Sequence, residues 1–421
     1  MAQMQDIEEV MEQVILVGVC LEDGDDTRDS LEELEELVKT AGAVTVGTIV
    51  QNRDAVHPGT YVGKGKIDEI KMMIDAMEAT GIVCDDELSP AQMRNLEQEL
   101  GVKVMDRTMI ILDIFAARAS TSEGKIQVEL AQLKYRMTRL IGMGRSMSRL
   151  GGGIGTRGPG EKKLEIDRRL IKDRIAQLNR ELDEVRRHRE ITRNQRNKSH
   201  MPVAAIVGYT NAGKSTLLNQ LTDAGVLEED KLFATLDPTT RVLELAGHQQ
   251  ILLTDTVGFI RKLPHHLIDA FKSTLEEAKY ADFIIHVVDA SNPQAEKQMH
   301  IVYETLQNLG VTGKKVITLF NKQDKAASNE PMRDGRADQT LRISAKNGQG
   351  LEQVKELLAQ ILRESKHYAE LLIPYEKSAL LQQIHMQGEL IEEEYLAEGT
   401  FVKAYLPAEL YGKICKTQDN N

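Results

Sequence analysis

The string GYTNAGKS at residues 208–215 has the residue types and spacing of a phosphate-binding loop. It follows the apolar run PVAAIVG and precedes a helical pattern, which is the context that a GxxxxGKS/T string requires. Glycines let backbone N–H groups close around phosphate oxygens, and the helix start adds a positive dipole. Lys214 is expected to contact the β- and γ-phosphates, and Ser215 to ligate Mg²⁺. The residues predicted to surround the phosphates are Gly208, Tyr209, Thr210, Asn211, Ala212, Gly213, Lys214 and Ser215.

The string NKQD at residues 321–324 predicts which base accompanies those phosphates, because it ends the apolar strand pattern VITLF. The Asp324 carboxylate can accept hydrogen bonds from guanine N1–H and the 2-amino group, a pair of donors that adenine lacks. A second string, SAK, follows at the end of the next predicted strand. We expect it to complete a pocket for the base of GTP or GDP. The residues of this predicted pocket are Asn321, Lys322, Gln323, Asp324, Ser344, Ala345 and Lys346.

The string DTVGF ends an apolar strand pattern 40 residues after the phosphate-binding loop. Asp255 is expected to hold Mg²⁺ through water, and the Gly258 N–H to contact the γ-phosphate. Signalling GTPases have a glutamine after this glycine, which orients the attacking water, whereas this chain has Phe259. Either the string is not a nucleotide-sensing switch, or hydrolysis follows another route. Because the other GTPase strings are present, we interpret DTVGF as a switch and expect slow hydrolysis by the isolated protein.

The string FATLDPTTR at residues 233–241 predicts a polar loop between the phosphate-binding loop and DTVGF. Loops at this place in GTPases are ordered by Mg²⁺ and the γ-phosphate. Thr235, Thr239 and Thr240 are candidates for a second magnesium ligand, and spacing alone does not choose among them.

Strand and helix patterns alternate in residues 1–121. The predicted strands are 14–19, 43–50, 81–86 and 102–107, and the predicted helices lie near 27–40, 64–79 and 89–100. This alternation indicates a small, mostly parallel α/β domain. SPAQ at 89–92 predicts a serine cap with a proline in the first helical position. GKGK at 63–66 favours a turn with a lysine-rich helix start over a phosphate cradle.

Residues 200–365 alternate again and carry all the nucleotide-binding strings. Strands are predicted in PVAAIVG, QQILLTDT, DFIIHVVDA, KKVITLFN and TLRIS. Residues 366–421 predict a further small α/β domain, with a helix in KSALLQQIHMQG and strands in ELIEEEY and TFVKAYLP. The expected fold class is therefore α/β, with a P-loop domain built on a mostly parallel, doubly wound sheet.

Residues 122–199 carry a heptad-like pattern instead, with apolar residues three and four positions apart on both sides of a glycine-rich gap. This pattern predicts an antiparallel coiled-coil hairpin, with its second helix near 161–196. The apolar positions are Ile126, Leu130, Leu133, Met137 and Leu140, then Leu164, Ile171, Ile175, Leu178, Leu182 and Val185.

The hairpin region is basic in an otherwise acidic chain. Residues 120–200 hold 20 Lys+Arg against 10 Asp+Glu, while the whole chain has a net charge of −12. A basic block suggests a polyanionic partner for that block. The predicted tip carries Arg145, Arg149 and Arg157 and no aromatic residue, so we expect contact with RNA phosphates rather than stacked bases. A protein partner and a solvated linker are the alternatives.

Composition places the chain among ordinary soluble proteins, 41% hydrophobic and 28% charged. The three cysteines, Cys20, Cys84 and Cys415, are far apart, so reduced thiols in a cytosolic protein are expected. The start MAQMQDIEEV lacks the features of a signal peptide, and no run approaches the ~18 apolar residues of a membrane span. We therefore expect no stable membrane insertion.

Beyond these motifs the chain resembles the HflX GTPases, ribosome-associated proteins of the Obg-like group. The resemblance rests on YVGKGK, DRTMIILDIFAARA, EGKIQVELAQL, GGIGTRGPGEKKLEIDRR, FATLDPTTR and DTVGFIRKLP, and becomes loose in the C-terminal 55 residues. The patterns along the chain divide it into four predicted parts: an α/β domain (1–121), a hairpin (122–199), a GTPase domain (200–365) and a small C-terminal domain (366–421).

The resemblance also implies a function and a site. The function is GTP hydrolysis on the 50S ribosomal subunit, splitting of stalled ribosomes under stress, and insertion of the hairpin tip near ribosomal RNA. The resemblance selects Thr235 as the second magnesium ligand and, by analogy with similar GTPases, Asn211 as a potassium-holding residue. Further residues implied to lie beside the nucleotide are Phe233, Ala234, Leu236, Asp237, Thr256 and Val257. We expect a monomer in the cytoplasm, with peripheral membrane association and use of ATP left open.

Two functions from different classes fit this sequence. One is an RNA-engaging GTPase of the ribosome cycle, and the other is a signalling switch whose hairpin docks a protein. A hairpin that only dimerises the protein is disfavoured by the arginines at its tip, away from the apolar seam. Salt distinguishes the first two, because contacts with RNA phosphates release counterions and weaken steeply as salt rises.

Overall fold

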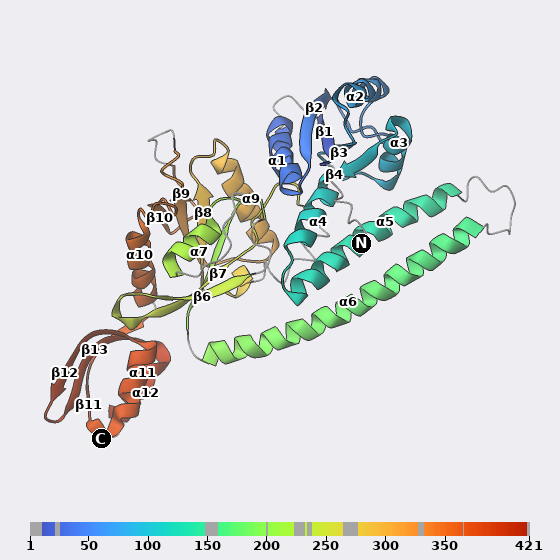
Figure 1. Ribbon diagram of the computed structural model, residues 1–421. Helices are drawn as coiled ribbons and strands as arrows, with labels where there is room; N and C mark the ends of the chain where they lie inside the picture. The colour runs from blue at the N-terminus through green and yellow to red at the C-terminus, as the bar shows by residue number, and fades with distance from the viewer. Residues whose placement is uncertain are drawn as a thin grey trace, which may run out of the picture. The chain divides into compact units, whose positions relative to one another are not determined.

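The computed structural model describes residues 11–21, 26–147, 159–198, 201–222, 232–233, 238–263, 277–326, 332–364 and 366–418. These residues fall into two compact units. The first contains the described residues up to Arg186 and those within Asp230–Leu236 and Arg261–Lys272. The second contains the remainder. Figure 1 shows the elements of both.

The N-terminal part of the first unit is a parallel four-stranded sheet in the order β2-β1-β3-β4. Its strands are β1 (Gln13–Cys20), β2 (Val44–Asn52), β3 (Gly81–Cys84) and β4 (Lys103–Asp106), and its helices are α1 (Thr27–Thr40), α2 (Lys64–Met77), α3 (Pro90–Leu100) and α4 (Arg107–Arg118). Helices α2 and α3 pack their apolar faces on one side of the sheet. The predicted strands and helices are confirmed to within two or three residues. Ser89 caps α3 in a reciprocal capping box with Gln92, as the SPAQ string predicts.

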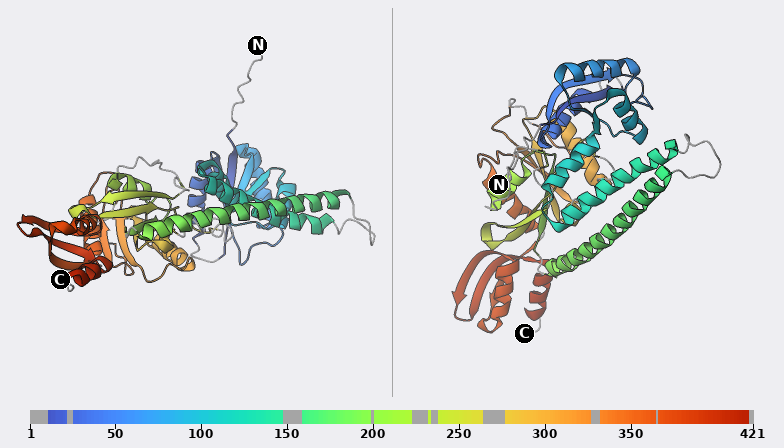
Figure 2. Two further views of the ribbon diagram at one scale, coloured as in Figure 1. Left: turned by 90° about the horizontal axis from the view of Figure 1, so that it is seen from below. Right: turned by 45° about the vertical axis from the view of Figure 1, so that its right-hand side comes forward.

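Two long helices follow, α5 (Ser122–Met147) and α6 (Pro159–Lys198), which run side by side in Figures 1 and 2. Leu130 of α5 packs on Leu178 and Leu182 of α6, with Ile126, Leu133 and Ile175 beside them. A two-bond ion pair between Arg174 and Glu129, at 2.7 and 2.8 Å, links the helices. The predicted apolar seam is therefore confirmed at these six positions. Helix α5 extends further than the sequence suggests, through Arg145, whereas Arg149 and Arg157 lie outside the described residues.

The second unit is built on a six-stranded sheet in the order β10-β9-β8-β5-β7-β6. Its strands are β5 (Val203–Gly208), β6 (Thr239–Glu244), β7 (Gln250–Asp255), β8 (Phe283–Asp289), β9 (Lys315–Asn321) and β10 (Gln339–Arg342). All neighbours are parallel except β6, which pairs antiparallel with β7. Helices α7 (Lys214–Thr222) and α10 (Leu351–Glu364) contribute to the main core on one face, and α9 (Ala295–Asn308) packs on the other. The α/β class and the mostly parallel sheet are confirmed.

Strand β6 corrects one expectation. The sequence predicts a polar loop throughout residues 233–241, but Thr239, Thr240 and Arg241 are strand residues paired with β7. The Thr240 hydroxyl lies 3.0 Å from that of Thr254. The polar string misleads because this edge strand is only partly buried at Thr239 and Thr240 and is exposed at Arg241.

The C-terminal part of the second unit is an antiparallel sheet in the order β11-β13-β12. Its elements are β11 (Lys366–Ile373), α11 (Ser378–Gln387), β12 (Glu389–Leu396), β13 (Gly399–Pro407) and α12 (Ala408–Gln418). Both helices pack on one face of the sheet. Helix α12 was not expected from the sequence, because its short apolar pattern follows Pro407 without a clear start signal.

Candidate nucleotide-binding site

The loop after β5 is shaped for close approach of phosphates. Gly213 has φ +94°, and a side chain there would meet the Asn321 amide, so only glycine fits. Asn211, at φ +59°, also lies in the left-handed region and is exposed. Helix α7 begins at Lys214, which directs the N–H groups of its first turn toward the loop. The predicted phosphate-binding residues therefore form one continuous turn at the carboxyl end of a central strand.

Lys214 is buried and its Nζ donates a hydrogen bond to the Tyr209 carbonyl at 2.9 Å. Burial lowers the pKa of Lys214 to about 8, and the carboxylate of Asp255 opposes that shift. A buried ammonium that rests on a loop carbonyl is suited to receive phosphate oxygens, which would restore its full charge. Ser215 follows on the helix, and its Oγ donates to Asp255 Oδ2 at 2.7 Å. A hydroxyl and a carboxylate thus meet beside the loop.

The DTVGF string lies directly on the phosphate-binding loop. The Phe259 N–H donates to the Gly208 carbonyl at 3.1 Å, and the Phe259 carbonyl accepts from the Thr210 N–H at 2.8 Å. A side chain at Gly258 would come within 2.7 Å of the Thr210 Cα, so this close contact requires glycine. Phe259 itself is 2% exposed. Its ring therefore belongs to the interior, and its backbone rather than its side chain holds the loop.

Two neighbouring residues complete the DTVGF segment. The Thr256 hydroxyl donates to the Ile206 carbonyl at 2.8 Å, and Val257 is buried.

Of the FATLDPTTR string, Phe233 is buried and has a left-handed backbone with φ +54°. Ala234, Thr235, Leu236 and Asp237 lie outside the described residues, so the predicted magnesium ligand Thr235 is not placed.

Asn321 joins three separate parts of the site. Its Nδ2 donates to the Ala212 carbonyl at 2.9 Å, and its Oδ1 accepts from the Ala345 N–H at 2.9 Å. Asn321 is 2% exposed, so both bonds are buried. One side chain therefore ties the phosphate-binding loop to the NKQD and SAK strings.

The carboxylate predicted to select the base, that of Asp324, is already oriented. Ser344 Oγ donates to Asp324 Oδ1 at 2.6 Å, and this bond holds the pKa of the Asp324 carboxyl below its usual range. Asp324 is exposed, as is Lys346, so both can reach an incoming ring. Gln323 is turned inward and donates to the Phe320 carbonyl at 3.1 Å. The seven predicted residues of the base pocket therefore lie at the end of β9 and in the loops that follow β9 and β10.

Asp289, at the end of β8, was missed by sequence reasoning. Its carboxylate pairs with Lys322 Nζ at 2.8 Å, and Lys322 has a left-handed backbone at φ +60°. The ion pair fixes the lysine of NKQD, which is expected to cover the base. The sequence did hold a signal for it, since Asp289 is a charged residue at the end of the apolar strand pattern DFIIHVVDA, and ligand-binding groups follow the carboxyl ends of parallel strands.

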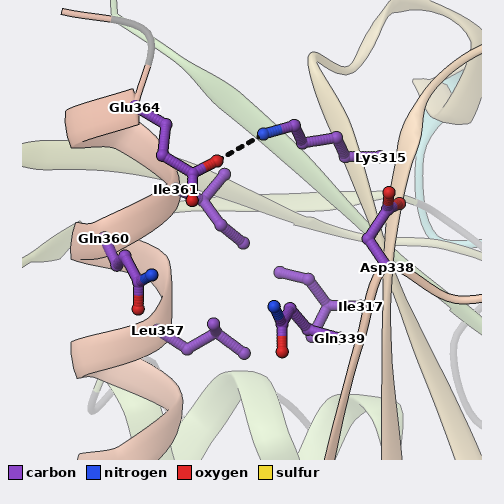
Figure 3. Close-up of a pocket in the computed structure, with 8 residues that line it drawn as sticks. All are labelled: Lys315, Ile317, Asp338, Gln339, Leu357, Gln360, Ile361 and Glu364. Carbon is purple, nitrogen blue, oxygen red and sulfur yellow. Dashed lines mark hydrogen bonds and ion pairs between the residues drawn. The ribbon is translucent and has the colours of Figure 1, made fainter.

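A separate cavity of about 200 Å³ lies between β9, β10 and α10 (Figure 3). Lys315 and Glu364, whose charged ends are 2.6 Å apart, line one side of it. Lys315 and Gln339 are the first residues of their strands, so the cavity is at the amino ends of β9 and β10. The phosphate-binding loop follows the carboxyl end of β5, which is the opposite edge of a parallel sheet. This cavity is therefore not the nucleotide site.

A mostly parallel sheet with a phosphate-binding loop after β5 and a guanine-selecting string after β9 defines a P-loop GTPase. Three family models match the chain: a GTP-binding GTPase N-terminal region over 28–116, a GTP-binding GTPase middle region over 118–196, and a 50S ribosome-binding GTPase over 203–322. The GTPase HflX of Lacrimispora saccharolytica is 64% identical over all of this chain and 99% of its own length. That of Escherichia coli K12 is 40% identical over 97% and 96%.

This chain therefore belongs to the HflX family of GTPases, as the sequence resemblance implies. It binds GTP and hydrolyses it to GDP and phosphate, and its GTPase domain is of the class that associates with the 50S subunit. Among solved structures, a GTP-binding protein of Sulfolobus solfataricus in complex with GDP is 26% identical over 83% of this chain and 98% of its own, with a TM-score of 0.45. None of the described helices is long and apolar enough to span a bilayer.

Proposed function

We propose that this GTPase binds the large ribosomal subunit through its hairpin, contacts ribosomal RNA with the hairpin tip, and splits stalled ribosomes under stress. The observation that carries the proposal is the basic hairpin joined to a GTPase domain of a ribosome-binding class. Helix α6 has 40 residues and is thus about 60 Å long at 1.5 Å per residue. A stiff hairpin whose second helix has this length can carry arginines deep into a large RNA particle.

In this proposal the hairpin is kept stiff by its own contacts. The packed leucines near one end and the Arg174–Glu129 ion pair prevent the two helices from separating. The arginines at the tip then act as phosphate ligands, which position a protein on RNA without reading sequence. The GTPase domain, residues 200–365, provides the nucleotide dependence of this binding.

The site residues have the following proposed roles. Lys214 moves from the Tyr209 carbonyl to the β- and γ-phosphates, and the Gly258 N–H contacts the γ-phosphate. Asp324 accepts from guanine N1–H and the 2-amino group, in the orientation that Ser344 supports. These roles use groups that all lie at the carboxyl ends of the strands of the sheet.

Mg²⁺ fits the oxygen ligands at this place. Ser215 Oγ and the Asp255 carboxylate are 2.7 Å apart, and hard oxygen ligands are those that Mg²⁺ prefers. We propose that Ser215 and Thr235 ligate the ion and that Asp255 holds one of its waters. The bound ion would neutralise phosphate charge during hydrolysis. We further propose that Asn211 supports a K⁺ ion against the phosphates, and that the protein acts as a monomer in the cytoplasm.

The test is co-sedimentation with 50S subunits in the presence of a non-hydrolysable GTP analogue. Changing Arg145, Arg149 and Arg157 together to Ala should reduce pelleting and flatten its salt dependence, because fewer counterions are released. A matched control changes Arg180, Arg186 and Arg187 to Ala, three arginines of α6 remote from the tip. Equal pelleting of the tip variant and the parent would contradict the RNA contact and favour a hairpin that docks a protein.

Splitting itself is measured by light scattering. Stalled 70S ribosomes mixed with the protein and GTP should lose scattering as subunits separate, and the tip variant should do so more slowly. Unchanged scattering with the parent protein would exclude the splitting role while leaving 50S binding in place.

A further inference from the structure

Two adjacent carboxylates follow β3, at the carboxyl edge of the N-terminal sheet. Asp85 is fully buried and accepts hydrogen bonds from Ser30 Oγ at 2.9 Å and from an Arg107 nitrogen at 2.8 Å. Asp86 accepts from the Tyr61 hydroxyl at 2.6 Å. Lys262 Nζ lies 2.5 Å from Asp85 Oδ2 and 2.7 Å from Asp86 Oδ1. The lysine therefore bridges both acids.

The charges around this lysine bridge show that the acids need it. Arg107 also pairs with Glu33, so its single charge is shared by Glu33 and Asp85, and Lys262 is the cation that reaches Asp86. A buried carboxylate without enough opposing charge is costly. The lysine side chain is 41% exposed, whereas that of Asp85 is 1% exposed, so the acid is the fixed partner. Lys262 thus supplies the charge that this cluster lacks.

The backbone of Lys262 supports the same conclusion. Its φ is +50°, in the left-handed region that a residue with a side chain rarely adopts. Such a conformation persists only where surrounding contacts hold it. Beside it, Arg261 lies 3.4 Å from Asp26. Two consecutive cations are therefore bound by acids of the N-terminal sheet region, and the backbone is bent to allow it.

Lys262 comes three residues after Phe259, the last residue of DTVGF. Phe259 is hydrogen-bonded through its backbone to Gly208 and Thr210 of the phosphate-binding loop. Only Ile260 and Arg261 lie between these two attachment points, a span of at most ~10 Å. The segment between them is therefore short, with Phe259 bonded to the phosphate-binding loop and Lys262 paired with Asp85 and Asp86.

The other nucleotide-sensing segment has a similar attachment. The ring of Phe233, at the start of FATLDPTTR, packs edge-on against Phe115 of α4, with centroids 4.7 Å apart. Phe233 and Lys262 both belong to the unit that contains the N-terminal sheet.

We propose that Lys262 is a positioning residue for GTP hydrolysis, which fixes the end of the DTVGF segment by its ion pairs with Asp85 and Asp86. Gly258 and Phe259 are then ordered before the reaction rather than during it. In a GTPase without the water-orienting glutamine, the placement of this backbone carries more of the catalysis. Releasing Lys262 lets the backbone at the end of this segment sample more conformations, and the transition state must reorder it. We expect about a tenfold loss of rate from that entropy.

The experiment uses the full-length protein and single-turnover hydrolysis of saturating GTP, with and without 50S subunits. Lys262→Glu and Lys262→Met should each lower the rate constant about tenfold in both conditions, while affinity for a fluorescent GDP changes less than about twofold. Lys262→Arg should keep at least half of the rate. Adding Asp86→Lys to Lys262→Glu should restore most of it. Asp86 is chosen because Asp85 is buried and also binds Arg107.

The control is Lys71→Glu, the same charge reversal at an exposed ion pair with Glu99 in the same unit. It should leave the rate unchanged. Circular dichroism melting confirms that each variant is folded. If Lys262→Glu and Lys262→Met hydrolyse GTP as fast as the parent or faster, the positioning role is overturned. The positioning role is also overturned if Lys71→Glu lowers the rate as much as Lys262→Glu does. It is overturned as well if adding Asp86→Lys to Lys262→Glu does not restore the rate.

Discussion

Replacing Asn321 by Ala should weaken the nucleotide-binding site more than any other single amide change in this domain. The substitution removes two buried hydrogen bonds of 2.9 Å, to the Ala212 carbonyl and from the Ala345 N–H. Each partner is then left buried without its bond, at a cost of about 1–3 kcal/mol. Some of that cost is recovered as water or neighbouring atoms move in. We therefore expect a total loss of about 2–4 kcal/mol.

The loss is divided between two measurable quantities, because the same bonds stabilise the free protein and hold the loops ready for GDP. Urea unfolding without nucleotide gives the first part, and titration with fluorescent GDP gives the second. Their sum should be about 2–4 kcal/mol for Asn321→Ala. The control Gln323→Ala removes one partly buried bond to the Phe320 carbonyl and should cost about 0.5–1.5 kcal/mol. If both variants lose the same amount, or Asn321→Ala loses under about 0.5 kcal/mol, the linking role of Asn321 is wrong.

Three more outcomes are expected. Asp324→Asn should weaken GTP binding by ~2–4 kcal/mol, because the amide keeps only one acceptor oxygen and sets its NH2 group against a donor of guanine; unchanged affinity in a fluorescent-nucleotide titration would contradict it. The isolated protein should hydrolyse GTP at only ~10⁻⁴–10⁻² s⁻¹, faster in KCl and fastest with 50S subunits, since Phe259 cannot orient water; single-turnover rates near 1 s⁻¹ in NaCl alone would show another source of catalysis. GDP affinity should fall as pH rises from 8 to 9, because burial lowers the pKa of Lys214 to about 8 and the neutral amine no longer attracts phosphate. In the same range the free energy of unfolding should rise with pH through Lys214, because the unfolded lysine keeps its proton to a higher pH than the folded one. A GDP affinity that does not change with pH would contradict the lowered pKa of Lys214.

The amino-acid sequence alone identified the phosphate-binding loop, the NKQD string and the heptad seam. These features depend on neighbours within a few residues. Gly213 needs its left-handed backbone, Lys214 begins a helix, and Leu130 and Leu133 repeat with a helical period. Local geometry of this kind can be predicted from the residue types and their spacing. The strand and helix limits of the N-terminal sheet follow from the same patterns.

Contacts between distant segments were decided only by the tertiary structure. The Asn321 bond to Ala212 joins residues 109 positions apart, and the Lys262 pair with Asp85 joins residues 177 positions apart. No periodicity encodes such pairings, because they depend on which strand lies beside which and on how far each side chain reaches. Strand β6 is a similar case. Its threonines belong to a polar string that is typical of a loop, and they form a strand only because they pair with β7. The sequence therefore determined the chemistry available to this GTPase, and the packing of the sheets determined which groups act together, because burial and distance exist only in the folded chain.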